Sequence, residues 1–172
     1  MKEIMKELDT MWMNTTGVSD MVKELKDAYN RSYKIVGIGA GRMGYSLRSH
    51  IMRLSHVGYE AYFIGDTTLP RIDPYTVVII NSSSGETPTN ILYAQQARAA
   101  NSYIITITTD TESTIAKLSD QLVIIPKMKS HQLMKSIYEQ YTMLMLDYVA
   151  EQVVTELDLD RSEITHNHSI LE

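Results

Sequence analysis

The strongest constraint on the fold is a run of four β-branched residues followed directly by a loop rich in hydroxyl groups. Residues 77–80 read Val-Val-Ile-Ile, and residues 81–88 read Asn-Ser-Ser-Ser-Gly-Glu-Thr-Pro. An uninterrupted β-branched run is typical of a strand that is buried on both faces of a parallel sheet. Pro88 suits the first turn of a helix. The segment therefore predicts a strand, a short loop and a helix.

The loop between this strand and this helix has the chemistry of an anion-binding site. At a helix N-terminus the free backbone N–H groups point outward, and short hydroxyl side chains add O–H donors without blocking a ligand. The alternative is a flexible turn whose serines only cap the helix. Capping needs one hydroxyl, whereas this loop carries four, on Ser82, Ser83, Ser84 and Thr87. The pattern favours an anionic ligand.

Composition limits the class of protein. A chain of 172 residues is long enough to bury the core of one domain. Its net charge of −5 leaves no basic face for nucleic acid, and the absence of cysteine excludes disulfides, thiolate metal sites and a cysteine nucleophile. The acidic, amphipathic N-terminus lacks the core of a secretion signal, and no stretch approaches the length of a membrane span. We expect a cytoplasmic protein without a nucleic-acid or membrane partner.

The apolar pattern alternates between short strands and helices along the chain. Helical spacing covers about residues 1–30, with a break near Asn14–Gly17. The later elements are strands at 33–38, 60–64, 77–80, 102–107 and 122–125, and helices ending near Val57 and covering 89–100, 113–118 and 136–157, before a polar tail. This order predicts an α/β fold, a three-layer α-β-α sandwich around a doubly wound, five-stranded parallel sheet. We expect one domain over 1–172, with its sheet core at about 33–126.

The predicted long helix is apolar on more than one face between residues 141 and 154. A helix of this kind lies in the centre of a core or is shared with another subunit. In a chain of this size we expect a homo-oligomer, a dimer or a tetramer. Its interface is expected to include Met143, Leu144, Met145 and Leu146.

A second glycine-rich turn follows the first predicted strand. Residues 39–44 fit the pattern G-x-G-x-x-G, and Asp66 lies at a distance suited to a ribose hydroxyl. A dinucleotide site would leave the serine loop unexplained, and the chain has little room for a separate substrate region. Two phosphate-binding turns on neighbouring strands instead predict one small phosphorylated ligand, held in the crevice where the strand order reverses.

These motifs together resemble the sugar isomerase (SIS) family, and within it the 6-phospho-3-hexuloisomerases. The serine loop is typical of the broad family, whereas the segment GDTTLP at 65–70 and the ending HSILE at 168–172 are typical of this branch. Segments 52–58 and 157–164 also match. The resemblance implies isomerisation of D-arabino-hex-3-ulose 6-phosphate to fructose 6-phosphate through a cis-enediol, without a metal or an organic cofactor. It also implies a role in formaldehyde assimilation, coupled to a hexulose-6-phosphate synthase.

The resemblance assigns roles to particular residues. The hydroxyls of Ser82, Ser84 and Thr87 match the phosphate ligands of the family, and Ser83 adds its side chain or its amide. Gly41 and Arg42 line the neighbouring turn, where Arg42 faces the phosphate or a sugar hydroxyl. These residues form the expected substrate-binding set.

Two residues are the candidate catalytic groups. Glu139 matches a family glutamate near the start of the long helix and would act as the base. The alternative is structural, since Ser136-Ile137-Tyr138-Glu139 fits a capping box. His168 matches the closing motif, and in related isomerases a neighbouring subunit supplies such a histidine; a histidine near a terminus is otherwise solvated. If Glu139 is only a cap, the base is His168 or Glu86.

The chain also departs from the family pattern. Met43 stands where members of this branch usually have serine. A Gly-Thr pair is common before the catalytic helix, whereas here Met134 is followed by Lys135 and Ser136. These changes leave open the sugar phosphate that is preferred. SIS domains also serve as non-catalytic phosphosugar sensors, generally attached to a DNA-binding domain. The first thirty residues carry too few positive charges to be such a domain, so a sensor would have to stand alone.

Overall fold

A computed structural model describes residues 1–168 and contains a five-stranded sheet in the order β2-β1-β3-β4-β5. All strand pairings are parallel. The strands are β1 (Lys34–Gly39), β2 (Ala61–Phe63), β3 (Thr76–Asn81), β4 (Tyr103–Thr108) and β5 (Gln121–Ile124). The predicted parallel α/β sheet is therefore confirmed, with strand ends that each shift by one residue.

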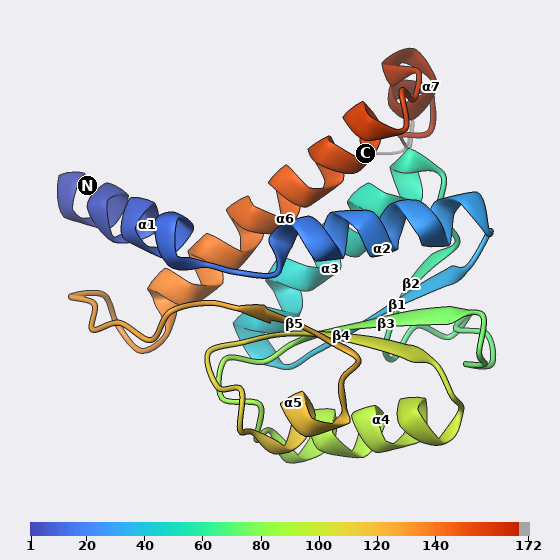
Figure 1. The fold of residues 1–172 in the computed structure, drawn as a ribbon. Coiled ribbons are helices and arrows are strands. Elements are labelled where there is room, and N and C mark those ends of the chain that lie inside the picture. Colours follow the sequence, from blue (N-terminus) through green and yellow to red (C-terminus); the bar gives the residue numbers. More distant parts are fainter. Residues whose placement is uncertain (169–172) are drawn as a thin grey trace.

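Helices cover both faces of the sheet (Figure 1). On one face lie α1 (Lys2–Asn14), α2 (Val18–Asn30), α3 (Gly41–Val57) and α6 (Ser136–Glu156). On the other face lie α4 (Pro88–Ala99) and α5 (Thr114–Leu118). This arrangement confirms the three-layer sandwich. None of the helices within residues 1–168 combines the length and hydrophobicity needed to cross a membrane.

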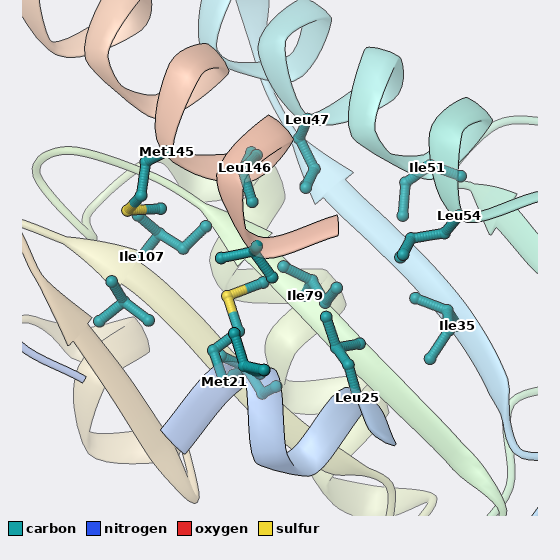
Figure 2. Packing of buried hydrophobic residues seen from close by; sticks show 14 of the residues in the cluster. Met21, Leu25, Ile35, Leu47, Ile51, Leu54, Ile79, Ile107, Met145 and Leu146 are labelled. Atoms are coloured by element: carbon teal, nitrogen blue, oxygen red, sulfur yellow. The ribbon is translucent and has the colours of Figure 1, made fainter. Parts of the chain in front are cut away.

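The central strand β3 divides its side chains between two cores. Val77 and Ile79 face the larger core, which α2, α3 and α6 complete, while Val78 and Ile80 face the core under α4 and α5. All four side chains are fully buried. Figure 2 shows the larger core, where Leu25, Leu47 and Leu146 from three helices surround Ile79. Burial on both faces explains why the strand has no polar alternation.

The tail is less irregular than the sequence predicts, because it contains the short helix α7 (Arg161–His166). The Asp160 carboxylate accepts a hydrogen bond from the Ser162 backbone N–H at 2.8 Å. An aspartate at the N-cap with Glu163 three residues later is a capping-box pattern, so a signal for this helix was present. The structure places α7 at the end of α6 that lies far from the 126–135 loop (Figure 1).

Two of the four residues predicted for the subunit interface are buried in their own chain, so the prediction is wrong for them. Met145 and Leu146 are only 1% and 0% exposed, because they belong to the core of their own chain. Met143 and Leu144 are 48% and 57% exposed on the outer side of α6. Only this outer side remains available to another subunit.

The strand order creates the crevice that the sequence predicts. The chain runs outward from β1 to β2, then returns to the other side of β1 to form β3. Gly39, at the end of β1, is paired in register with Asn81, at the end of β3. The glycine turn and the serine loop therefore leave the same edge of the sheet side by side, at the point where the strand order reverses.

The glycine turn is shorter than its motif suggests, because α3 already begins at Gly41. A Cβ atom on Gly44 would lie 2.6 Å from the Gly39 carbonyl oxygen, and one on Gly39 would lie 2.8 Å from the Gly44 Cα. Both contacts are with backbone, which cannot rotate away. The two glycines therefore let the first turn of α3 pack directly against the end of β1.

This contact gives a stability prediction. Alanine is the better helix former at position 44, yet a Cβ pressed against backbone should outweigh that gain and lower the free energy of unfolding by about 1–3 kcal/mol. Urea unfolding of Gly44→Ala measures the loss. Ser55→Ala, at an exposed position of the same helix, should stay within about 0.5 kcal/mol of wild type. Equal stability of wild type and Gly44→Ala would contradict the close packing.

Candidate active site

The backbone of the serine loop is held against the end of β4. The Ser82 N–H donates to the Ile107 carbonyl at 3.0 Å, and the Ser83 carbonyl accepts from the Thr109 N–H at 3.0 Å. The Ser83 carbonyl also accepts from the hydroxyls of Thr108 at 3.2 Å and Thr109 at 2.9 Å. Both serines are only 2% exposed. The path of the loop is thus set before a ligand arrives.

Two loop hydroxyls accept hydrogen bonds from amides of the same loop. Ser82 Oγ accepts from the Gly85 N–H and Ser84 Oγ accepts from the Glu86 N–H, each at 3.2 Å. A hydroxyl that accepts in this way keeps its own proton as a donor. Ser84 is exposed, so its proton is available to an anion from solvent. The buried Ser82 hydroxyl mainly supports the loop.

Thr87 and Gly85 complete the strand, loop and helix that the sequence predicts. Thr87 is the N-cap of α4, Pro88 is at the first helical position, and the Thr87 side chain makes no capping hydrogen bond. Its hydroxyl therefore stays available beside the first amides of a 12-residue helix. Gly85 has φ +65, and a Cβ there would lie 2.0 Å from Ser113 Oγ. Only glycine fits this turn.

The structure brings Arg42 and Glu139 together. Arg42 Nε donates to Glu139 Oε2, and the two side chains are 68% and 12% exposed. The Glu139 backbone carbonyl accepts from Ser46 Oγ at 3.0 Å and from Thr142 Oγ1 at 3.1 Å. Arg42 of α3 thus holds the Glu139 carboxylate, while Ser46 of α3 and Thr142 of α6 hold its backbone carbonyl. Through Arg42 the carboxylate is held at the first turn of α3, and a Cβ built on the neighbouring Gly41 would meet open space.

The capping-box interpretation of Glu139 is wrong. The N-cap of α6 is Lys135, without a side-chain capping bond, and Ser136 is already the first helical residue. The Ser136 N–H donates to the Leu133 carbonyl at 3.1 Å, so it does not meet the glutamate. The carboxylate turns to Arg42 because a guanidinium gives it a charge-assisted hydrogen bond.

A buried polar cluster that the sequence did not reveal connects the loop to α3 and α6. The Tyr138 hydroxyl lies 2.9 Å from Asn81 Oδ1 and 3.0 Å from the Ile107 carbonyl oxygen. Asn81 Nδ2 donates to the Met43 carbonyl at 3.1 Å and to Thr142 Oγ1 at 3.4 Å. Burial raises the pKa of Tyr138 well above its usual range, so its hydroxyl stays a neutral donor. An asparagine at the end of an apolar strand was the only signal of this cluster.

Two acids that the sequence singled out have structural roles. Glu86 accepts from the Thr114 N–H at 2.6 Å and from the Thr114 hydroxyl at 2.9 Å, so it ties the serine loop to α5. Asp66 accepts from the Phe63 N–H at 2.8 Å and from Arg48 at 2.9 Å. These hydrogen bonds, first that of Phe63, lower the pKa of the Asp66 carboxyl. Asp66 is thereby occupied in its own turn, which removes the acid that a dinucleotide site requires.

His168 does not lie near Glu139 of its own chain. Its ring packs against the His56 ring, with centroids 5.1 Å apart, at the end of α3. An α-helix rises about 1.5 Å per residue, which puts His56 roughly 20 Å along α3 from Arg42. Residues 169–172 of the closing motif lie outside the described part of the chain. The structure thus groups Gly41, Arg42, Glu139 and the serine loop, without His168.

A cavity of about 180 Å³ lies beside the serine loop. Ser83, Thr109 and Tyr138 line one side of it, and the 126–135 loop lines the other. Lys127 and Lys135 contribute positive charge to this lining, although Lys127 is also paired with Asp110 at 2.8 Å. Positive side chains close to the loop favour an anionic ligand over a neutral one.

A parallel sheet of order 2-1-3-4-5, with a hydroxyl-rich loop at the point where the strand order reverses, defines a doubly wound α/β fold. The profile of the family described as "SIS domain" matches residues 29–150. The chain belongs to this family.

Named relatives cover most of the chain. A 3-hexulose-6-phosphate isomerase of Methanocaldococcus jannaschii is 33% identical over 145 residues, which are 84% of this chain and 80% of that protein. The protein of the same name from Bacillus subtilis is 32% identical over 158 residues, 87% of this chain and 85% of that protein.

A solved structure from Methanococcus jannaschii shows the same fold. It has a TM-score of 0.85 and 30% identity, and the alignment covers 99% of this chain and 96% of that chain. A molecular function of 3-hexulose-6-phosphate isomerase has been inferred for that protein. The Vibrio vulnificus NanR protein, solved as a complex with ManNAc-6P, has a TM-score of 0.76 at 17% identity, covers 96% of this chain and 63% of that chain, and supports the fold alone.

The exposure of the loop serines gives a prediction that separates ligand binding from stability. Ser84→Ala should weaken the binding of inorganic phosphate about 2- to 10-fold, the net value of one hydrogen bond, with little loss of stability. Ser82→Ala should leave the buried Gly85 N–H with one acceptor fewer and cost about 1–2 kcal/mol of unfolding free energy. Calorimetric titration and urea unfolding measure the two effects.

The triple variant with alanine at 82, 84 and 87 should bind no phosphate, and unchanged binding would overturn the assignment of the loop.

Proposed function

We propose that this protein interconverts D-arabino-hex-3-ulose 6-phosphate and fructose 6-phosphate. The observation that carries the proposal is the Glu139 carboxylate, which Arg42 binds. The residue after Arg42, Met43, contacts the Ser83 amide of the proposed phosphate-binding loop. The names of the relatives supply the substrate. A sensor needs only the phosphate loop, whereas this reaction also needs a base near the sugar carbons. The fixed position of Glu139 favours the enzyme.

In the proposed mechanism the serine loop fixes one end of the sugar. Ser84, Thr87 and the first amides of α4 bind the phosphate, with Ser82 and Ser83 shaping the loop around it. This anchor places the carbons between the loop and Glu139, next to the open turn at Gly41. Binding energy from the phosphate thus orients carbons that react several bonds away.

Glu139 is the proposed base. In the direction from fructose 6-phosphate it takes the proton from C3, while the C2 carbonyl oxygen gains a proton, which produces the 2,3-enediol. Return of the proton to C2 and loss of the O3 proton give the 3-ketose, so that no atom is gained or lost. Arg42 binds Oε2 and orients the carboxylate, and within residues 1–168 the other oxygen, Oε1, accepts no hydrogen bond. Oε1 is the oxygen placed to take the proton.

The proton movements at the sugar oxygens are assigned to a histidine of a second copy. In its own chain His168 packs against His56, which lies roughly 20 Å along α3 from Arg42. The partner subunit's His168 could reach the site in a homo-oligomer, either a dimer or a tetramer. We propose the outer side of α6 as the contact, since Met143, Leu144 and Tyr148 are exposed there. Trp12 extends this surface, with its ring 4.7 Å from that of Tyr148.

The proposed substrate also suggests a cellular role. A 3-ketose 6-phosphate must be supplied by an enzyme that builds it, which we take to be a hexulose-6-phosphate synthase. The protein would then act in the cytoplasm, in formaldehyde assimilation and carbohydrate metabolism. Its product, fructose 6-phosphate, is an ordinary ketose phosphate.

Proton exchange with solvent tests the reaction and the base together. In D2O the wild-type protein should introduce deuterium at C3 of fructose 6-phosphate, as measured by NMR, because the enediol joins C2 and C3. Glu139→Gln can still accept the Arg42 hydrogen bond but cannot take a proton from carbon. It should keep the wild-type melting temperature and lose about 10²–10⁴-fold in rate.

Ser136→Ala is the matched control at the start of α6, and it should exchange at the wild-type rate because Ser136 caps nothing. Deuterium at C1 in place of C3 would indicate a different isomerase. An absence of exchange together with tight binding of fructose 6-phosphate would favour a sensor. Full activity of Glu139→Gln would remove Glu139 as the base.

A charged substitution on the outer side of α6 tests the proposed oligomer. Leu144→Glu should yield monomers in light scattering and should reduce turnover while retaining phosphate binding, because the loop is complete within one chain. Leu92→Glu, at a position of α4 that is 52% exposed on the opposite layer, should leave both mass and turnover unchanged. A wild-type protein that is monomeric and active at micromolar concentration would contradict the trans role of His168.

A further inference from the structure

Met43 belongs to the glycine turn at the start of α3, and its side chain contacts the serine loop. Its sulfur accepts the Ser83 backbone N–H, with 3.5 Å between Sδ and N. A thioether is a weak acceptor, whereas a phosphate oxygen is charged and forms hydrogen bonds about twice as strong as neutral ones. A phosphate that reached this amide would therefore replace the sulfur as its acceptor.

The Ser83 amide is held in place independently of Met43. The Ser83 carbonyl accepts from the Thr109 N–H and from the hydroxyls of Thr108 and Thr109. The neighbouring Ser82 N–H is bound to the Ile107 carbonyl. With the peptide groups on both sides fixed to β4, the Ser83 N–H keeps its direction when its acceptor changes.

The backbone of Met43 is also fixed, so only its side chain can move. Its carbonyl accepts from Asn81 Nδ2 at 3.1 Å, and the next residue, Gly44, packs against the Gly39 backbone. Met43 is half-buried rather than enclosed. Its unbranched side chain has three rotatable bonds, and it can leave the amide without any shift of α3.

We propose that Met43 is an affinity-determining residue whose thioether competes with the substrate phosphate for the Ser83 amide. The inference rests on the proposed phosphate-binding role of the serine loop. It adds a free-energy cost to phosphate binding, because the contact between Met43 Sδ and the Ser83 N–H must be broken. Each binding event exchanges a hydrogen bond to sulfur for one to phosphate. The Met43 side chain moves out of the site when the anion enters.

Two substitutions measure this competition with inorganic phosphate as the probe. Met43→Leu keeps the volume and removes the sulfur acceptor, and Met43→Ala removes the bulk as well. Both should lower the dissociation constant for phosphate about 2- to 10-fold, the value of one net hydrogen bond. Met52→Leu is the matched control, since Met52 is on the same helix and 46% exposed. Tighter binding in either Met43 variant supports the competition, and unchanged or weaker binding in both overturns it.

The movement of the side chain has its own readout. The ¹³C resonance of the Met43 ε-methyl group, identified by its absence in Met43→Leu, should shift on titration with phosphate while that of Met52 stays in place. A Met43 resonance that is unaffected at saturating phosphate would overturn the proposal.

These titrations separate the role of Met43 from that of the serine loop. Phosphate binding by wild type that Met43 substitutions do not improve removes only the role of Met43. A complete lack of phosphate binding in wild type and in both variants removes the serine-loop site, and the role of Met43 with it.

Discussion

The arrangement of the site depends on the buried hydrogen bonds of Asn81. This residue ends the central strand, and its side chain meets Tyr138 and Thr142 of α6 and the Met43 carbonyl of α3. A buried amide that lost these partners would leave several polar groups unsatisfied, each at a cost of about 1–3 kcal/mol. The cluster therefore links β3, α3 and α6 through buried hydrogen bonds. The serine loop begins at the next residue, so this loop and Glu139 share one support.

The architecture follows from features that are local in the sequence. The β-branched run of β3 has no polar alternation because both of its faces are covered, and the strand–helix alternation predicts parallel pairing. Pro88 marked the start of α4, and the serine loop and glycine turn were expected at a shared crevice. Each of these features depends on neighbours in the chain or on a general rule of sheet topology, and sequence alone therefore sufficed.

What sequence could not predict depends on contacts between distant segments. Ser136 and Glu139 fit a capping box, but Arg42, far away in the chain, offers the carboxylate a charged donor. Met145 and Leu146 look like interface residues until α2 and the sheet cover them, as Figure 2 shows. The contact of Met43 with the Ser83 amide depends on the packing of the start of α3 against the serine loop. The distance of His168 from Glu139 follows from the length of α3, which no motif contains.

The central claim is that the serine loop and Glu139 act on one sugar phosphate. The most direct measurement is a crystal structure of the protein with fructose 6-phosphate. We predict the phosphate at Ser84 and Thr87, and C3 of the sugar within about 3–3.5 Å of a Glu139 carboxylate oxygen. The opposite edge of the sheet holds a cavity of about 450 Å³, lined by Arg31, Arg98 and Asp120 among others. A sugar phosphate bound there, or bound at the loop with its carbons turned away from Glu139, would contradict the account.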